Sequence, residues 1–358
     1  MKICLLGDTH FSCRNDSLDF HNYFKEFFSE IFFPYIINNN IDTIFQFGDI
    51  FDKRKYINFN SLYLSKSYFF DKLTEYNIKL YTLLGNHDIF FKESLIVNSP
   101  HLLLQSYDNI TIFDKFTTIE LNNINIDIVP WICNENREEI LNNINSSNSS
   151  LCFGHFELAG FEFDPGNISK AGLDKSILTK YDTVYSGHFH HKSKQNNIQY
   201  LGTPVELTWA DYNDPKGFYI LDLSTLETEF IKNTINIFHK IIYDDLDKSL
   251  DYWETFDCSK YTNCYIKIIV INKTNPYIFD KLLGALYKNN PLDISIIEDF
   301  SDIDNNDDNN VIDQNKDTLS LLFDYIDTQE LVIDNNRMKT LIQEVYIEAL
   351  NSNIIGGN

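Results

Sequence analysis

The sequence predicts an α/β sandwich built from two mixed β-sheets, and three observations support this fold class. Between residues 3 and 84, apolar runs of strand length alternate with stretches in which apolar residues recur at helical spacing. Between residues 117 and 223, further apolar runs are separated by turn residues. Five of these predicted strands end at a glycine that is followed by polar side chains. The pattern of apolar and polar residues changes near residue 235, which predicts a smaller module after the main domain.

The N-terminal part of the chain predicts three strands joined by helices. The strands are expected over residues 3–6, 41–47 and 78–84. Aromatic and aliphatic residues at helical spacing predict helices over residues 18–37 and 59–76, and a further helix is expected over residues 95–107. This alternation is typical of a sheet whose strands are connected by helices.

The middle of the chain predicts mainly β-structure. Residues 117–121 and 124–131 form an expected hairpin with Asn122-Asn123 at its turn, followed by a polar helix over 135–144. Strands are expected over 150–153 and 183–185. Residues 198–201 and 217–223 are expected to complete a sheet. The main domain is therefore predicted to span residues 1–234.

The C-terminal third divides into three predicted parts. Residues 235–300 contain two strand-like runs and a helix, which predicts a small α+β domain. Residues 301–317 are almost wholly Asp, Asn and Ser, so an acidic flexible linker is expected. Residues 318–358 carry two short amphipathic helical patterns. Such helices cannot bury their apolar faces alone, so they either fold back on the main domain or dock into a partner.

The acidic composition restricts the kinds of partner. The 358-residue chain has a formal net charge of −23, which argues against a protein that coats nucleic acid by itself. It does not exclude an enzyme that acts on a phosphodiester through bound metal cations. A local DNA-facing surface could use a few basic residues, each of which could equally be an ordinary solvated side chain. These are Lys53, Arg54, Lys55, Lys92, Lys192 and Lys194.

Cysteine usage and the N-terminus favour a cytoplasmic setting. The six cysteines show no Cys-x-x-Cys spacing, so a reduced compartment fits better than a disulfide framework. Met1-Lys2-Ile3 leads directly into a strand, so no signal peptide is expected. No apolar run approaches the length of a membrane span.

The polar residues at the five strand ends predict a metal site, because α/β sheets bind their ligands at the carboxyl ends of the strands. They are Asp8, His10, Asp49, Asn86, His87, His155, His188 and His190. A mixed oxygen and nitrogen set of this size is too large for one ion and suits two divalent cations of the Mn²⁺, Fe²⁺ or Zn²⁺ type. The set contains no cysteine, which argues against a structural zinc site. Each histidine alone could be an ordinary core or loop residue, but that alternative requires five coincidences.

Two such cations, roughly 3.5–4 Å apart, clamp a phosphoryl group and lower the pKa of a bound water. Asp49 stands alone at its strand end, which suits a carboxylate that bridges both ions. His87 is adjacent to Asn86 and is the candidate for an unliganded imidazole that protonates a leaving oxygen or stabilises charge on the phosphate.

The order of the motifs resembles the calcineurin-like metallophosphoesterase superfamily. The motifs are Asp-x-His, Gly-Asp-x-x-Asp, Gly-Asn-His-Asp, Gly-His and Gly-His-x-His, between residues 7 and 190. Within it, the chain is similar to the SbcD-type DNA repair nucleases, including phage members. That similarity rests on Gly48-Asp49-Ile50-Phe51-Asp52, on residues 130–136, 186–190 and 202–204, and on the stretch from Asn213 to Phe218. It implies a four-layer sandwich, with two mixed sheets flanked by helices, a small capping domain and C-terminal helices.

The resemblance also implies roles for individual residues. One metal would be held by Asp8, His10, Asp49 and His190, and the second by Asp49, Asn86, His155 and His188. His87 would be the catalytic imidazole. Asp52 stands where archaeal and eukaryotic relatives carry a second histidine, and it is expected to orient His87 through a hydrogen bond, unless it merely caps a helix.

The activity implied by the resemblance is Mn²⁺-dependent cleavage of DNA. Such enzymes act as exonucleases and as endonucleases on single strands or hairpins, and they process DNA ends in recombination and double-strand break repair. Their C-terminal helices bind an SMC-like ATPase, and a homodimer is expected. The helices predicted over 59–76 and 95–107 are candidates for its interface, although their periodicity fits core packing equally well.

Two alternatives stand beside the nuclease. The first is another phosphoesterase, such as a protein phosphatase or a cyclic-nucleotide phosphodiesterase, which the core motifs barely distinguish. The added C-terminal module and helices favour the nuclease. The second is a non-catalytic scaffold that regulates an ATPase, which the intact set of ligands and His87 argues against.

Overall fold

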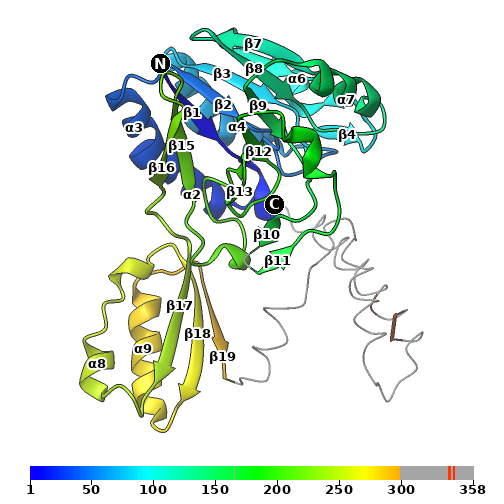
Figure 1. Cartoon of the computed structure of the whole chain (residues 1–358). Helices are drawn as coiled ribbons and strands as arrows, with labels where there is room; N and C mark the ends of the chain where they lie inside the picture. The colour runs from blue at the N-terminus through cyan, green and yellow to red at the C-terminus, as the bar shows by residue number, and fades with distance from the viewer. Residues whose placement is uncertain (165, 299–337, 340–341, 343–358) are drawn as a thin grey trace. The chain divides into compact units, whose positions relative to one another are not determined.

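The computed structural model describes residues 1–164, 166–298, 338–339 and 342 (Figure 1). Two six-stranded sheets form the main body and confirm the predicted α/β sandwich. The predicted linker over 301–317 lies outside the described residues, as do nearly all of residues 318–358. Within the described part of the chain, no helix is long and apolar enough to cross a membrane.

The first sheet has the strand order β16-β15-β1-β2-β3-β6. Its strands are β1 (Lys2–Leu6), β2 (Thr43–Gln46), β3 (Lys79–Leu83), β6 (Ile110–Phe113), β15 (Gly217–Asp222) and β16 (Glu227–Lys232). β1, β2, β3 and β6 pair in parallel, whereas β15 runs antiparallel to both β1 and β16. The parallel pairing brings the carboxyl ends of β1, β2 and β3 to the same edge of the sheet.

The second sheet has the strand order β13-β14-β12-β9-β8-β7. Its strands are β7 (Thr117–Leu121), β8 (Ile124–Val129), β9 (Leu151–His155), β12 (Thr183–Gly187), β13 (Ser193–Gln195) and β14 (Ile198–Tyr200). The β7–β8 hairpin turns at Asn122 and Asn123, as predicted, and both residues have the positive φ that such turns need. β9 and β12 are parallel with Gly187 opposite His155, so both strands end side by side.

One expectation about the sheets was wrong. Residues 198–201 and 217–223 do not complete a single sheet, because β14 belongs to the second sheet and β15 to the first. β15 pairs with β1 from Lys2 opposite Asp222 to Leu5 opposite Tyr219, and five of its six residues are buried. The apolar pattern predicted a buried strand correctly, but it carries no information about which strand is the partner.

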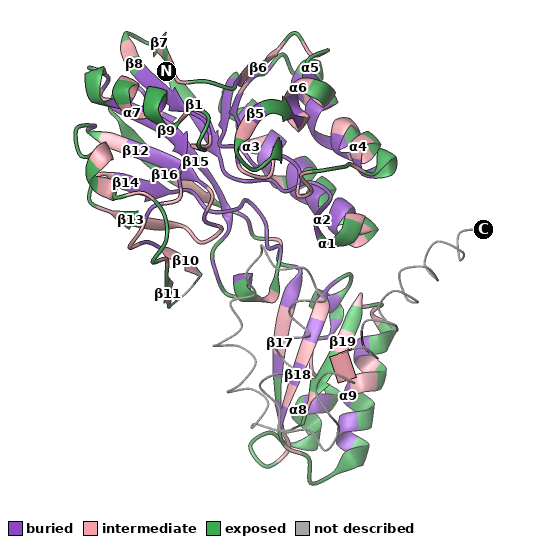
Figure 2. Cartoon of the chain, turned by 90° about the vertical axis from the view of Figure 1, so that its right-hand side faces the viewer, coloured by how far each residue is buried: buried purple, intermediate pink, exposed green. Residues whose placement is uncertain are grey.

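The layers are held by three apolar clusters. Between the sheets, Phe45 of β2 meets Phe153 of β9 with ring centroids 5.0 Å apart. The outer face of the first sheet packs against the N-terminal helices, and that of the second against α7 (Arg137–Ser146) through Ile140 and Ile144. Figure 2 shows the buried strands enclosed by helices with exposed outer faces. The arrangement is the expected four-layer sandwich.

The helices on the first sheet are interrupted by wider turns. The one predicted over 18–37 consists of α2 (Leu18–Phe27), a π-helical turn (Phe28–Phe32) and α3 (Phe33–Asn38), after the short turn α1 (Cys13–Asp16). The one predicted over 59–76 consists of α4 (Phe59–Ser65), a π-helical turn (Lys66–Phe70) and α5 (Asp71–Glu75). The two π-helical turns pack together, with the rings of Phe28 and Phe69 4.6 Å apart.

The helix predicted over 95–107 is shorter than expected. Its first part is a strand, β5 (Ser94–Asn98), which pairs with β4 (Ile89–Phe91) as a hairpin. The helix α6 covers only Ser99–Leu104. Asn98 accepts a hydrogen bond from the backbone N–H of His101 at 3.0 Å, and Pro100 lies in the first turn, so the helix begins there and not earlier.

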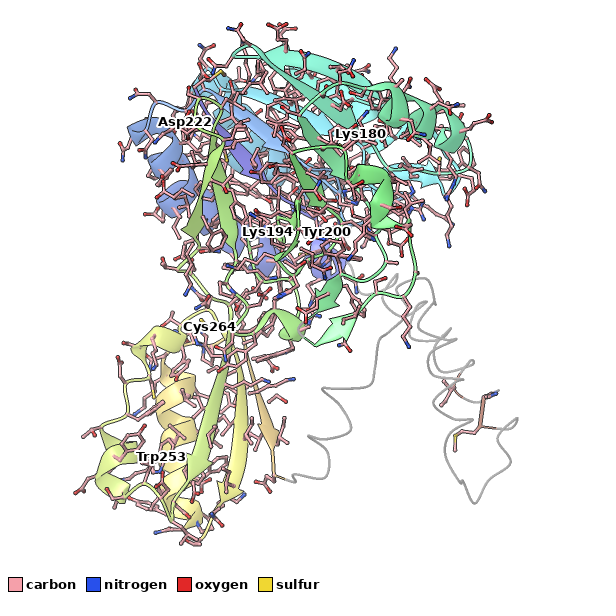
Figure 3. All side chains as sticks on the ribbon, in the orientation of Figure 1. Lys180, Lys194, Tyr200, Asp222, Trp253 and Cys264 are labelled. Carbon is pink, nitrogen blue, oxygen red and sulfur yellow. The ribbon has the colours of Figure 1, made fainter. Side chains whose placement is uncertain are left out.

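A third sheet follows the main body of the chain. It contains the parallel strands β17 (Phe238–Asp244), β18 (Tyr265–Asn272) and β19 (Asp293–Ile297), together with α8 (Leu250–Glu254) and α9 (Pro276–Lys288). It has its own core, where Trp253 packs on Tyr243 with ring centroids 4.8 Å apart (Figure 3). At its start, the Glu206 carboxylate accepts the backbone N–H groups of Ile237 and Phe238.

The remaining elements are short. They are the strands β10 (Glu162–Asp164) and β11 (Asn167–Ile168) and the 3₁₀ turns Lys175–Leu178, Trp209–Asp211 and Ser259–Tyr261.

Candidate metal centre

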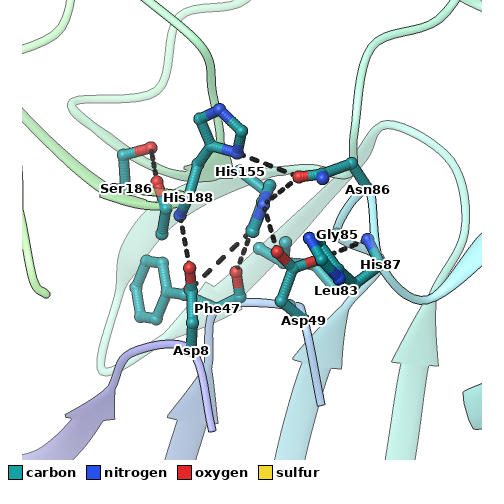
Figure 4. Close-up of polar contacts among 12 residues, drawn as sticks. Asp8, Phe47, Asp49, Leu83, Gly85, Asn86, His87, His155, Ser186 and His188 are labelled. Atoms are coloured by element: carbon teal, nitrogen blue, oxygen red, sulfur yellow. Dashed lines mark hydrogen bonds and ion pairs between the residues drawn. The ribbon is translucent and has the colours of Figure 1, made fainter. Parts of the chain in front are cut away.

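The polar residues at the five strand ends lie together at one edge of the two sheets (Figure 4). Their potential ligand atoms form three overlapping groups, and within each group all of these atoms lie within 4.8 Å of one another. The groups are Asp8, His10 and His190; His10, Asp49 and His87; and Asp49, His155 and His188. Asn86 joins the third group, because its Oδ1 lies 3.0 Å from His155 Nε2 and 2.9 Å from His188 Nδ1. The structure thus brings together every strand-end residue that the sequence nominates.

Asp49 occupies the middle of the site. Its Oδ2 lies 3.7 Å from His10 Nε2 on one side and 3.4 Å from His155 Nε2 on the other. Its Oδ1 accepts the backbone N–H of His87 at 2.7 Å. Gly85 makes this approach possible, since a Cβ at that position would lie 2.1 Å from Asp49 Oδ1. The position between two groups of imidazoles is the one that a bridging carboxylate needs.

The donor set fits cations because, when the rings are neutral, lone pairs converge without enough protons to separate them. His155 Nδ1 lies 2.6 Å from the Phe47 carbonyl and therefore donates to it. His10 Nε2 and His190 Nε2 face each other at 3.0 Å, where at most one neutral ring can donate. The buried Asp8 Oδ1 has no hydrogen-bond partner among the described residues, although Oδ2 accepts the backbone N–H of His188 at 2.8 Å. A cation is the partner that this geometry lacks.

The electrostatics of the site also favour cations. Burial opposes the imidazolium forms of His10 and His155, but nearby carboxylates, above all Asp52 and Asp49 for His10 and Asp49 for His155, outweigh it and raise the pKa of each ring to about 9. Burial raises the pKa of Asp8 to about 7. The carboxylates therefore attract protons when no other cation is bound. A divalent ion would displace those protons, because it binds the neutral ring and the ionised carboxyl group.

We expect metal binding to release protons and to strengthen as the pH rises. Because His10 and His155 have a raised pKa near 9, both rings are charged below that pH and must lose a proton to become ligands. The apparent Mn²⁺ affinity should therefore rise up to about tenfold per pH unit for each proton released, between about pH 6 and pH 8. Calorimetry in buffers of different ionisation enthalpy counts these protons. An affinity that is flat across this range, with no proton release, would contradict either the raised pKa of these rings or their role as ligands.

His87 is held at the rim of the site by the loop that follows β2. Its Nδ1 lies 2.6 Å from the backbone carbonyl of Asp52 and donates to it, which leaves Nε2 without that proton. Its ring meets that of His10 edge-on, with centroids 4.8 Å apart. Burial lowers the pKa of His87. The ring is therefore neutral near pH 7 in the protein without substrate.

Asp52 contacts His87 through its backbone, and not through its side chain as the sequence had predicted. The hydrogen bond that orients His87 comes from the Asp52 backbone carbonyl, whereas the Asp52 carboxylate lies 3.5 Å from His10 Nδ1. The side chain therefore acts on the ring of a predicted ligand, and the backbone acts on the catalytic candidate. A side-chain pattern could not have shown this, because every residue type carries the same carbonyl.

Asp88, for which the sequence indicated only a structural hydrogen bond, joins two loops. Its carboxylate accepts the backbone N–H groups of Asp49 at 2.8 Å, Ile50 at 3.0 Å and Gly85 at 2.8 Å. The loop after β3 and the loop after β2 are thereby fixed to each other. Asn86 and His87 gain their positions from this contact.

Sequence reasoning missed a buried ion network behind His190. Lys216 Nζ donates to the His190 carbonyl at 2.9 Å and pairs with Asp214 at 2.8 Å and Asp211 at 2.5 Å. Asp214 also lies 2.9 Å from His191 Nδ1, so His191 points to this network. The only signal in the sequence was that residues 213–218 resemble the SbcD-type nucleases, and that resemblance assigned no role to Lys216.

The basic residues nominated for DNA make mostly local contacts. Lys53 pairs with Asp16 at 2.8 Å, and Lys192 lies over the ring of Phe230. Arg54 differs, because its Nε donates to the Ile89 carbonyl beside the metal centre, and no described carboxylate forms an ion pair with it.

A two-sheet sandwich with such a centre at its strand ends defines a metallophosphoesterase. Residues 1–192 match the calcineurin-like phosphoesterase family, and the chain belongs to this family. It is therefore a metal-dependent phosphodiester hydrolase, and the family uses divalent metals.

Particular relatives narrow the comparison. The chain is 34% identical to exonuclease subunit 1 of Enterobacteria phage T4 over 355 residues, 98% of this chain and 99% of that one. It is 26% identical to the 244L protein of Invertebrate iridescent virus 6, which is named as a phosphoesterase, over 68% of this chain and 89% of that one. SbcD, one component of the SbcCD nuclease of Staphylococcus epidermidis, is 27% identical over 25% of this chain and 26% of its own. The predicted resemblance to SbcD-type and phage nucleases is confirmed.

Proposed function

We propose that this chain is a Mn²⁺-dependent DNA nuclease subunit that processes DNA ends in recombination and double-strand break repair. The observation that carries the proposal is the similarity to an exonuclease subunit over almost the whole of both chains. The complete metal centre supports it, because a chain that only served as a scaffold would not need the full donor set together with His87. The expected products come from exonuclease action and from cuts in single strands or hairpins.

Two Mn²⁺ ions would be held by the residues of the centre. The proposed ligands of one are Asp8, His10, Asp49 and His190, and those of the other are Asp49, Asn86, His155 and His188. When bound, two such ions lower the pKa of a water ligand and neutralise charge on the phosphate.

The chain's own residues position the catalytic side chains and supply a proton to the leaving group. Asp52 and Asp88 fix the loops on which His87 and Asn86 lie. His87 keeps Nδ1 on the Asp52 carbonyl and turns Nε2 to the substrate side, where it can stabilise phosphate charge or donate a proton to the leaving 3′-oxygen. His87 is neutral in the free protein, so donation requires that the phosphate first raise its pKa.

Each segment of the chain has a proposed role in the complex. Residues 1–234 form the nuclease domain, 235–300 a capping domain, 301–317 a linker, and 318–358 helices that bind an SMC-like ATPase. A homodimer is supported by side chains on α4, β5 and α6 that are large, apolar and more than 60% exposed. These are Phe59, Tyr63, Ile96 and Leu102. We place this complex in the cytoplasm, which is the host cytoplasm if the chain is phage-encoded.

We expect the chain, loaded with Mn²⁺, to shorten end-labelled linear DNA. The assay compares single-stranded, duplex and hairpin DNA, with and without the ATPase, alongside a small phosphomonoester and a phosphoprotein. Metal chelation is the negative control, and a chain without residues 318–358 should lose only the stimulation by the ATPase. Rapid hydrolysis of the phosphomonoester or phosphoprotein, with all DNA left intact, would contradict the nuclease and favour a phosphatase.

A further inference from the structure

A cavity of about 250 Å³ lies beside the metal centre. It shares His155 with the centre, and Ile132, Phe156 and Leu173 form its apolar walls. Cavities that enclose drug-sized ligands measure roughly 300–1,000 Å³, so this one suits a smaller group. Its position places any bound group next to a phosphate at the metals.

Trp131 gives the cavity an aromatic wall on a fixed support. Its ring centroid lies 5.2 Å from that of His188 and 5.9 Å from that of His155. Its backbone N–H donates to the Leu84 carbonyl at 2.7 Å, and its own carbonyl accepts the Asn136 side chain at 2.9 Å. A half-buried aromatic ring held in this way is the kind of platform on which nucleobases stack.

Two ionisable side chains complete the lining, and neither forms an ion pair with a described residue. Glu157 is half-buried, and no described residue donates a hydrogen bond to its carboxyl group. Arg137 forms no ion pair with any described carboxylate. The backbone of Glu157 is fixed, because its carbonyl accepts the Leu173 N–H at 2.8 Å. The cavity therefore offers one acceptor and one cation next to an aromatic surface.

We propose that this cavity binds one nucleobase of a DNA strand whose neighbouring phosphodiester lies at the metal centre. Trp131 stacks on the base, and Glu157 accepts a hydrogen bond from an exocyclic amino group, which adenine, cytosine and guanine carry and thymine lacks. Arg137 faces a base acceptor or the adjoining phosphate. A phosphate within the cavity itself is disfavoured, because the Glu157 carboxylate would repel it. The inference rests on the proposed nuclease function and adds to it the group that seats the strand.

The test uses single-stranded oligonucleotides that carry either a base or an abasic site next to the cleaved linkage. For the Mn²⁺-loaded full chain, removal of the base should lower kcat/KM about tenfold. Trp131→Ala should cause a similar loss on the normal strand and little further loss on the abasic strand, and Trp131→Phe should restore most of the activity. Glu157→Gln should reduce the preference for cytosine over thymine at this position, whereas the exposed control Glu139→Gln should keep it.

Bis(p-nitrophenyl) phosphate, which has no nucleobase and no strand, reports whether the centre hydrolyses a phosphodiester at all. Its aromatic rings could also contact Trp131, so the abasic strand is the reference for stacking, and the ratio of kcat/KM on the normal strand to that on the abasic strand should fall about tenfold in Trp131→Ala. If the wild type cleaves abasic and normal strands equally, or Trp131→Ala loses the same factor on both, the inference is wrong and the nuclease proposal stands. If the wild type hydrolyses the small diester but no oligonucleotide, the proposed function fails, and the inference fails with it.

Discussion

Asp49→Asn is expected to lower kcat/KM at least 10³-fold and to abolish the binding of a pair of Mn²⁺ ions. The reason is the position of its carboxylate, 3.7 Å from His10 on one side and 3.4 Å from His155 on the other. Asparagine keeps an oxygen that can accept the His87 N–H but loses the charge that two cations would share. Loss of a single residue that only supports a ligand costs about 10–100-fold in metal affinity or activity, so loss of a shared ligand should cost more.

The loss must be separated from unfolding. Asp108→Asn, at an exposed carboxylate, is the matched control and should retain wild-type activity and metal binding. Circular dichroism of the metal-free proteins should show the same secondary structure for both variants. An Asp49→Asn protein that is folded and still binds two ions would remove Asp49 from the bridging role.

His87→Ala is expected to lower kcat by about 10²–10⁴-fold while leaving metal binding intact. His87 lies close enough to His10 and Asp49 to be considered a third ligand. Its ring is held instead by the Asp52 carbonyl, and the other predicted ligands form complete sets without it. An unliganded imidazole predicts loss of turnover with retained metal, whereas a ligand predicts loss of both.

The measurement is single-turnover hydrolysis beside a Mn²⁺ titration of the same protein. His87→Gln, which can still donate one hydrogen bond, should recover part of the rate if the ring stabilises phosphate charge. It should recover none if the ring must transfer a proton. Full activity in His87→Ala would show that the imidazole has no part in the reaction.

The fold and the centre could largely be predicted because both follow from local patterns. Each of the five strands is a short apolar run that ends at a glycine, and parallel pairing gathers their carboxyl ends within each sheet. The partner of β15 could not be predicted, since a buried strand shows the same pattern in either sheet. The start of α6 was missed because residues 94–97 fit a helix or a strand about equally well.

Supporting contacts were the hardest to foresee. The Asp52 carbonyl that orients His87 leaves no trace in side-chain chemistry. Lys216 acts through the carbonyl of His190, across 26 positions of sequence, and a single Lys between Pro215 and Gly217 carries no signal for such a role. The cavity wall formed by Glu157 and Leu173 depends on a loop contact that no periodic pattern encodes.

The most direct test of the account is the number of Mn²⁺ ions that the wild-type chain binds, measured together with their electron paramagnetic resonance spectrum. Three overlapping groups of ligand atoms, two of which include Asp49, predict two ions per chain when His87 is not a ligand. Ions roughly 3.5–4 Å apart should give the spectrum of a spin-coupled pair, which Asp49→Asn removes. A single uncoupled ion in the wild type, or a spectrum unchanged by Asp49→Asn, would contradict the two-metal centre and the chemistry derived from it.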